Sequence, residues 1–170
     1  MPPEPLLVAP SPDTPPPGFV ESILDIHWNI DRPRANVWAW LCDPATFVDG
    51  QVWPYRVEFL DDSGGLGGFR TGCYNAHLGP GMCFAGVIGE IRDGEYRDLQ
   101  YSYGSYALTH RLFRPTRLQF WAEDADDGGG TVLRCRIDAH VRTRAVGLWE
   151  RAVRLFFGRF GRWCEQAVAA

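Results

Sequence analysis

The sequence predicts an α+β fold in which a curved antiparallel sheet of about seven strands wraps around a long C-terminal helix, with two short helices after the first strand. Two observations lead to this prediction. Between residues 24 and 143, apolar and polar side chains alternate in short runs separated by Gly, Pro or Asp, which indicates strands with short connections. Over residues 146–168 the spacing of apolar residues changes to three and four, which indicates a helix.

The first strand is predicted over residues 24–30, where four apolar side chains share one face: Leu24, Ile26, Trp28 and Ile30. Pro33 follows its end, and residues 34–42 are predicted to form a short helix. Three side chains of that helix recur at helical spacing: Val37, Trp38 and Leu41. Asp43-Pro44 stops the helix, and a second helical turn is predicted over residues 45–48.

The remaining strands follow in quick succession. One is predicted around Tyr55, Val57 and Phe59, and the others over residues 69–78, 82–91, 97–103, 106–113, 117–123 and 131–143. In the last strand one face is apolar, with Leu133, Cys135, Ile137, Ala139 and Val141. The other face is expected to be wet, with Arg134, Arg136, Asp138, His140 and Arg142. Glycines within strands are expected to mark bulges or bends at Gly86, Gly89 and Gly104.

The predicted C-terminal helix has one large apolar stripe. Its members recur at intervals of four and three: Trp149, Val153, Phe156, Phe160, Trp163 and Ala167. Five arginines cluster in the same segment, mostly off the stripe: Arg144, Arg151, Arg154, Arg159 and Arg162. A sheet is therefore expected to bury the stripe, and this helix to organise the core.

Composition predicts one domain preceded by an arm. Residues 1–18 contain eight prolines and no long apolar run, so they are expected to form a disordered arm rather than a signal peptide. With 45% hydrophobic residues, the rest of the chain, 19–170, is long enough for a single domain with its own core.

Charge and cysteine content exclude several classes of function. The net charge of −4 makes a general nucleic-acid binder a poor match, and all 17 basic residues are arginine, which excludes a Schiff-base or phosphate-loop lysine. Five cysteines without a CxxC pair indicate free thiols, and we expect a cytoplasmic protein. The absence of a long apolar run predicts no integral membrane association.

The segment Ile30 to Asp43, with Pro33, Val37-Trp38 and Asp43, resembles the START-like or SRPBCC superfamily, whose fold is called helix-grip. Together with the terminal helix, the resemblance covers about residues 22–168. It implies a START-like ligand-binding domain with a cavity between the concave sheet and the last helix. Because the superfamily includes lipid carriers and polyketide cyclases and dehydratases, the implied ligand is a hydrophobic or aromatic, lipid- or polyketide-like molecule.

Ten residues are expected to line that cavity: Trp28, Tyr55, Phe84, Tyr101, Tyr103, His110, Phe120, Trp149, Val153 and Phe156. The aromatic walls would supply affinity, while Tyr101, Tyr103 and His110 would orient polar ends of the ligand. Asn75 and His77 share a strand face just before a turn, and exposure at the rim is the simpler interpretation for them.

Two alternative functions remain open. One is a polyketide cyclase or dehydratase with His110 as acid and base, although residues 82–91 lack the serine and arginine that cyclases of the superfamily carry on the comparable strand. The other is a protein-interaction or membrane-surface module that uses the arginine-rich helix and the proline-rich arm. The four histidines lie on different strands without paired spacing, so neither a metal site nor a cofactor is predicted. The sequence leaves the ligand's identity and the oligomeric state open.

Overall fold

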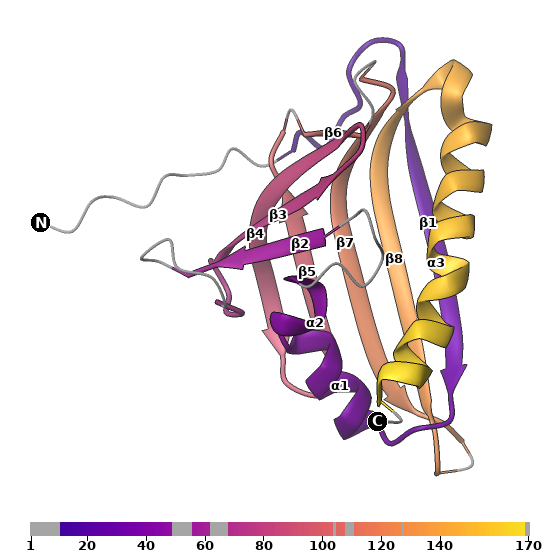
Figure 1. Cartoon of the computed structure of the whole chain (residues 1–170). Helices are drawn as coiled ribbons and strands as arrows, with labels where there is room; N and C mark the ends of the chain where they lie inside the picture. Colours follow the sequence, from indigo (N-terminus) through magenta and orange to yellow (C-terminus); the bar gives the residue numbers. More distant parts are fainter. Residues whose placement is uncertain are drawn as a thin grey trace, which may run out of the picture.

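A computed structural model describes residues 11–48, 56–61, 68–103, 105–107, 111–126 and 128–168. Its strands form one eight-stranded antiparallel sheet, which curves beside a long C-terminal helix (Figure 1). The elements in chain order are β1 (Phe19–Ile30), α1 (Arg34–Cys42), α2 (Ala45–Val48), β2 (Arg56–Leu60), β3 (Tyr74–Gly79), β4 (Met82–Arg92), β5 (Tyr96–Tyr101), β6 (Tyr106–Ala107), β7 (Phe113–Asp124), β8 (Thr131–Arg142), a 3₁₀ turn (Thr143–Ala145) and α3 (Val146–Val168). The predicted fold class is confirmed.

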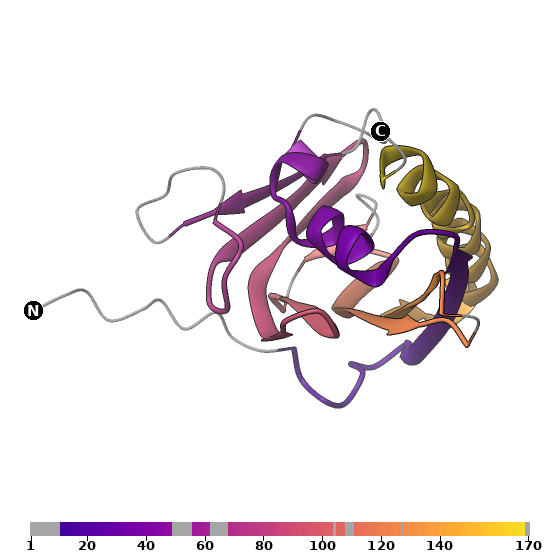
Figure 2. The same ribbon diagram turned by 90° about the horizontal axis from the view of Figure 1, so that it is seen from below.

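The strands are ordered β1-β8-β7-β5-β4-β3-β2 across the sheet, and the short β6 pairs with β4 and β7. The face toward the helices is called the inner face below, and the opposite one the outer face. Seen from below, α1 lies within the curve of the sheet and α3 runs beside β1 (Figure 2). The two short helices therefore close one end of the concave side.

Several predicted strand limits are wrong, and each error has a local cause. The strand predicted from residue 69 begins only at Tyr74, because residues 70–73 form a turn with Gly72 at φ +89°. The segment predicted as two strands, 106–113 and 117–123, is the short β6 followed by one long β7. A register shift between Pro115 and Arg117 lets β7 continue through the proline.

Two glycines allow neighbouring strands to approach closely. A Cβ atom at Gly86 would lie 2.0 Å from the carbonyl oxygen of Gln100, and one at Gly89 would lie 2.1 Å from Oδ1 of Asp98. The pairing of β4 with β5 also shifts register between Ile88 and Ile91. The expected bulge or bend is thus present near Gly89. Gly104 lies outside the described residues.

The helix α3 presents a different stripe from the predicted one. Its buried residues are Trp149, Val153, Phe157, Phe160, Gly161 and Cys164. Phe156 is 40% exposed and Ala167 is exposed, so their predicted burial is wrong. The predicted stripe repeats every 3.5 residues and drifts by roughly 20° per heptad relative to a straight helix of 3.6 residues per turn, so Phe157 takes the inward position.

The helix α3 packs mainly on β1 and β8 and against α1. Trp28 of β1 is central to this contact, since its ring centroid lies 5.4 Å from that of Phe160 and 6.3 Å from that of Phe157. A Cβ atom at Gly161 would lie 2.3 Å from Cδ1 of Trp28, so the glycine allows the helix to approach this closely. The inner face of β3, β4 and β5 lies beyond this contact, across the sheet from β1 (Figure 1).

Part of the N-terminal arm lies on the outer face. The hydroxyl of Ser11 donates a hydrogen bond to the carbonyl oxygen of Tyr101 at 3.1 Å, and the amide of Phe19 donates to the carbonyl oxygen of Pro16 at 3.0 Å. Residues 1–10 lie outside the described part of the chain, so the disordered arm stays a prediction there. None of the described helices is both long enough and apolar enough to cross a membrane.

Candidate functional site

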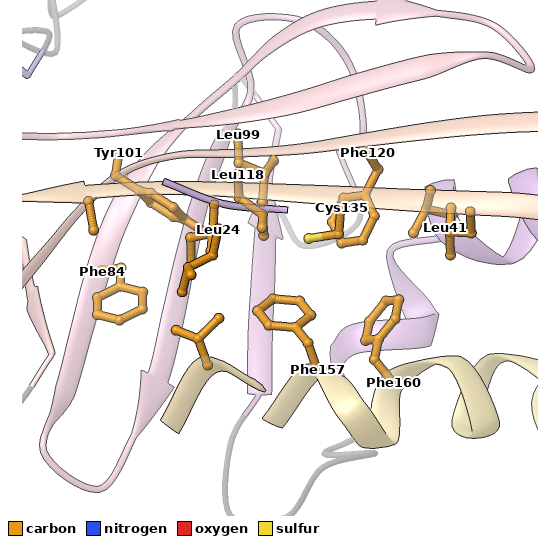
Figure 3. Packing of buried hydrophobic residues seen from close by; sticks show 14 of the residues in the cluster. Leu24, Leu41, Phe84, Leu99, Tyr101, Leu118, Phe120, Cys135, Phe157 and Phe160 are labelled. Carbon is orange, nitrogen blue, oxygen red and sulfur yellow. The ribbon is translucent and has the colours of Figure 1, made fainter. Parts of the chain in front are cut away.

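The inner face of β3, β4 and β5 combines aromatic walls with polar side chains. Strand pairing aligns Asn75 with Gly86 and Gly86 with Tyr101, while His77 is opposite Phe84. Because side chains alternate between faces, the register places the following residues on the inner face: Asn75, His77, Phe84, Ile88, Arg97, Leu99 and Tyr101. Figure 3 shows Phe84, Leu99 and Tyr101 on the sheet side, with Phe157 and Phe160 pointing toward the sheet from α3.

His77, Phe84 and Tyr101 form a three-ring cluster. The centroid of the His77 ring lies 5.2 Å from that of Tyr101 and 5.9 Å from that of Phe84, and the two benzene rings are 5.6 Å apart. The Nε2 atom of His77 and the hydroxyl of Tyr101 are hydrogen-bonded at 3.3 Å. This cluster therefore joins an apolar surface to a pair of groups that can donate or accept a further hydrogen bond.

Both polar groups of this cluster are neutral at neutral pH. Burial, with the positive charge of Arg97 as a smaller cause, lowers the pKa of His77 to about 3. Burial also raises the pKa of the Tyr101 phenol well above its usual value, although Arg97 opposes that shift. The pair can therefore hydrogen-bond a ligand without adding a charge of its own.

Arg97 is the charged group of the inner face. Its side chain is 2% exposed, and its guanidinium carbon lies 4.7 Å from the ring centroid of Phe120, 5.2 Å from that of Phe69 and 5.7 Å from that of Phe47. Its Nε and Nη1 atoms are buried without a hydrogen-bond partner among the described residues. Burial lowers the pKa of Arg97, but a guanidinium keeps its proton in proteins.

Asn75 is the second unpartnered polar side chain here. It is 1% exposed, and neither its Oδ1 nor its Nδ2 atom has a hydrogen-bond partner among the described residues. The expectation that it lies exposed at the rim is wrong, because β3 is an inner strand paired with β2 on one side and β4 on the other. A buried amide that makes none of its hydrogen bonds is uncommon and calls for a partner.

The predicted site residues have different positions. Phe84, Tyr101, Phe120, Trp149 and Val153 are buried, and Trp28 is half-buried against α3. Two others point away from the interior: Phe156 is exposed on α3, and the ring of Tyr103 lies 4.1 Å from the guanidinium carbon of Arg114 on the outer side. Tyr55 and His110 lie outside the described residues, so the acid-base role suggested for His110 stays a prediction.

Arg97 was not among the candidates from the sequence, although a signal for it was present. Arg97, Leu99 and Tyr101 are two residues apart along β5, and side chains two residues apart in a strand lie on the same face of the sheet. Charged residues are rarely buried, so the residue type alone would not place Arg97 in the core.

The outer face has a polar cavity of about 420 Å³ beneath the N-terminal arm. Its lining consists of Ser11, Pro12, Asp13, Glu21, Val87, Gln100, Tyr101, Thr116, Arg117, Asp138 and His140. His140 is 3% exposed, which contradicts the expectation of a wet position, and burial, followed by the charge of Arg114, lowers its pKa. This lining is a poor match to an apolar ligand.

The described residues contain no group of three or more His, Cys, Asp or Glu side chains that could hold a metal ion. The five cysteines are all free thiols; Cys83 is exposed, whereas Cys73, Cys135 and Cys164 are buried. Burial raises the pKa of the half-buried Cys42 to about 11, which removes its thiolate at neutral pH. The polar chemistry on the inner face therefore depends on Asn75, His77, Arg97 and Tyr101.

Comparison with solved structures identifies the fold. Norcoclaurine synthase from Thalictrum flavum, in complex with dopamine and hydroxybenzaldehyde, superposes with a TM-score of 0.63 at 11% identity, covering 89% of this chain and 88% of that chain. Ara h 8.0201 gives a TM-score of 0.58 at 13% identity, covering 88% of this chain and 99% of the other. A protein of unknown function from Staphylococcus aureus gives 0.61 at 9% identity, covering 89% and 98%.

These similarities show the helix-grip, START-like fold that the resemblance in the sequence implied, and at such low identity they show the fold alone. No family model matches the sequence. No curated protein matches it either.

Proposed function

We propose that this chain binds an apolar, aromatic small molecule at the inner face of β3, β4 and β5, on the side facing α3. The ligand would contact the rings of Phe84 and Tyr101, and its polar end would meet the hydrogen-bonding pair formed by His77 and Tyr101. Such a site is mostly apolar, with a few placed polar groups that set the ligand's orientation.

One observation carries this proposal: the interior has buried polar side chains with no partner. A core built only for stability leaves few such groups, because each unpaired buried amide costs roughly 1–3 kcal/mol. Both amide atoms of Asn75 and two nitrogens of Arg97 are unpaired among the described residues. A bound molecule with hydrogen-bonding groups would remove that cost.

The comparisons support the class of ligand. Norcoclaurine synthase, which shares the fold, is described in complex with dopamine and hydroxybenzaldehyde, which are small aromatic molecules with polar substituents. The same kind of molecule fits a surface of aromatic rings with a neutral donor and acceptor pair.

Fluorescence titration with N-phenyl-1-naphthylamine, a neutral aromatic probe, tests the proposal. We expect saturable binding at one site per chain, and several-fold weaker binding for Phe84→Ala, because Phe84 is part of the aromatic wall. Leu155→Ala is the matched control, since Leu155 is 66% exposed on the far side of α3. A folded wild-type protein that does not bind the probe would refute the proposal.

A second candidate function rests on the outward face of α3. Leu148 and Leu155 are exposed there and alternate at helical spacing with the exposed arginines Arg151, Arg159 and Arg162. This combination of apolar and cationic side chains is complementary to an anionic membrane surface. The face is separate from the buried stripe, so docking would leave the core intact.

Flotation with vesicles tests this second function. We expect the protein to float with vesicles of phosphatidylglycerol at low salt and to remain unbound with phosphatidylcholine. Leu155→Ser should weaken flotation without changing the fold, because Leu155 is not part of the core. Equal recovery with both lipids, or none with either, would refute it.

A further inference from the structure

We propose that the molecule bound at the inner face carries an anionic group and that Arg97 is the counter-ion of that group. This inference rests on the proposed function and names the class of ligand: an aromatic or apolar molecule with a carboxylate or another ionised oxygen group.

The first step is the isolation of the Arg97 charge. Neither Nε nor Nη1 of its guanidinium has a hydrogen-bond partner, and Arg97 takes part in none of the ion pairs found among the described residues. The neighbouring carboxylate, Asp98, points to the outer face, where its Oδ2 atom accepts a hydrogen bond from Nε of Arg117 at 2.6 Å. Asp93 is also engaged, since its Oδ1 atom accepts a hydrogen bond from Nε1 of Trp38 at 2.9 Å.

The second step is the nature of the surroundings. The rings of Phe47, Phe69 and Phe120 attract a cation, but they leave the N–H groups of Nε and Nη1 without an acceptor. A charge buried in this way is unfavourable unless an opposite charge accompanies it. Arg114, a buried arginine of the outer face, also leaves Nε and Nη1 without a partner, but its Nη2 atom donates to the hydroxyl of Tyr106.

The third step is the fit of an anion to the site. A guanidinium presents N–H donors on more than one edge, and the unpaired Nε and Nη1 atoms point to different edges, so each can donate to a separate oxygen of an anionic ligand. The charge of Arg97 also acts on His77 and Tyr101, so the positive field extends to the proposed binding surface. The Nδ2 atom of Asn75 is a further free donor on the same face.

Two fluorescent probes with the same ring skeleton test the inference. 8-Anilinonaphthalene-1-sulfonate differs from N-phenyl-1-naphthylamine by one sulfonate group. We expect the wild-type protein to bind the sulfonate probe at least about tenfold more tightly than the neutral probe, because a hydrogen bond to a charged group increases affinity by about that factor or more. Arg97→Met should remove this preference while keeping the affinity for the neutral probe within about twofold.

Two further measurements test whether the preference for the sulfonate probe comes from Arg97. Arg151→Met, which removes an exposed arginine of α3, should keep the preference. In the wild type the preference should also persist in about 1 M NaCl, because salt screens a buried charge pair only a little. This measurement does not depend on whether the Arg97→Met variant folds. Equal wild-type affinities, a preference lost in salt, or a preference kept by Arg97→Met would overturn the inference, whereas binding of neither probe would overturn the proposed function itself.

Discussion

The guanidinium carbon of Arg97 lies 4.7 Å from the ring centroid of Phe120, within the hydrophobic core. The two residues are directly opposite each other in the pairing of β5 with β7. This charge gains cation–π contacts but no ion pair among the described residues. The arrangement is unfavourable for a ligand-free protein and favourable for one that binds an anion. Stability and binding are therefore expected to oppose each other at this position.

The first prediction concerns that opposition. In ligand-free protein, Arg97→Met should raise the free energy of unfolding by about 1–3 kcal/mol, because an apolar side chain of similar length replaces a buried charge. Urea denaturation of protein stripped of bound molecules measures the change. A loss of stability of the same size would show that the arginine is satisfied within the chain itself.

The second prediction concerns the contact between α3 and β1. Gly161→Ala should destabilise the protein by about 1–3 kcal/mol, because the added Cβ would clash with the ring of Trp28. Gly158→Ala is the matched control: a Cβ there meets nothing within 4 Å, so better helix propensity should stabilise by about 0.5–1 kcal/mol. Thermal unfolding of both variants tests the pair, and similar shifts for the two would contradict the described packing.

The third prediction tests the direction in which α3 faces. Phe157→Ala should cost about 3–5 kcal/mol, because the ring is buried against Trp28 and Phe160. Phe156→Ala should cost less than about 1 kcal/mol, because that residue is 40% exposed and is not part of the buried stripe. Denaturant titrations compare the two neighbours directly. A larger loss of stability for Phe156→Ala than for Phe157→Ala would contradict the described packing and support the apolar stripe predicted from the sequence.

The fourth prediction concerns pH. The folded-state pKa of His77 is about 3, against an ordinary value of 6.5, so between these values the unfolded chain binds a proton that the folded chain does not. Stability should therefore be lost as pH falls from about 6.5 toward 3, by up to about 1.4 kcal/mol per pH unit from this one group. His77→Gln should flatten the dependence between about pH 4 and pH 6.

His140 has its pKa lowered too, so some slope should remain in His77→Gln. Identical slopes for the wild type and His77→Gln would show that His77 is solvated in the folded protein.

The parts of the fold with strong local patterns were predictable from the sequence. The helix α1 agrees with the predicted one, because its buried residues repeat at helical spacing: Val37, Trp38 and Leu41. The strand β8 also agrees, because its buried apolar residues repeat every second position. Phe156 and Phe157 are adjacent, so a choice of period decided which of them was assigned to the core. Pro115 was read as a break because a bulge that accommodates it has no sequence signature of its own.

The candidate site was predictable only in part. Phe84 and Tyr101 follow from alternation, and they do lie on the inner face. Arg97 was missed because its environment is made by residues distant in sequence: Phe47 from α2, Phe69 from the segment before β3, and Phe120 from β7. Only the tertiary structure shows that an arginine at this position is surrounded by rings.

The most direct test of a ligand site at the inner face is a map of NMR chemical-shift changes on titration with N-phenyl-1-naphthylamine. The largest changes are expected at inner-face residues such as His77, Phe84 and Tyr101, and on the inward side of α3 at Val153. Outer-face residues such as Val87 and Asp138 should be unaffected. Changes concentrated on the outer face, or none at saturating probe, would contradict the proposed site.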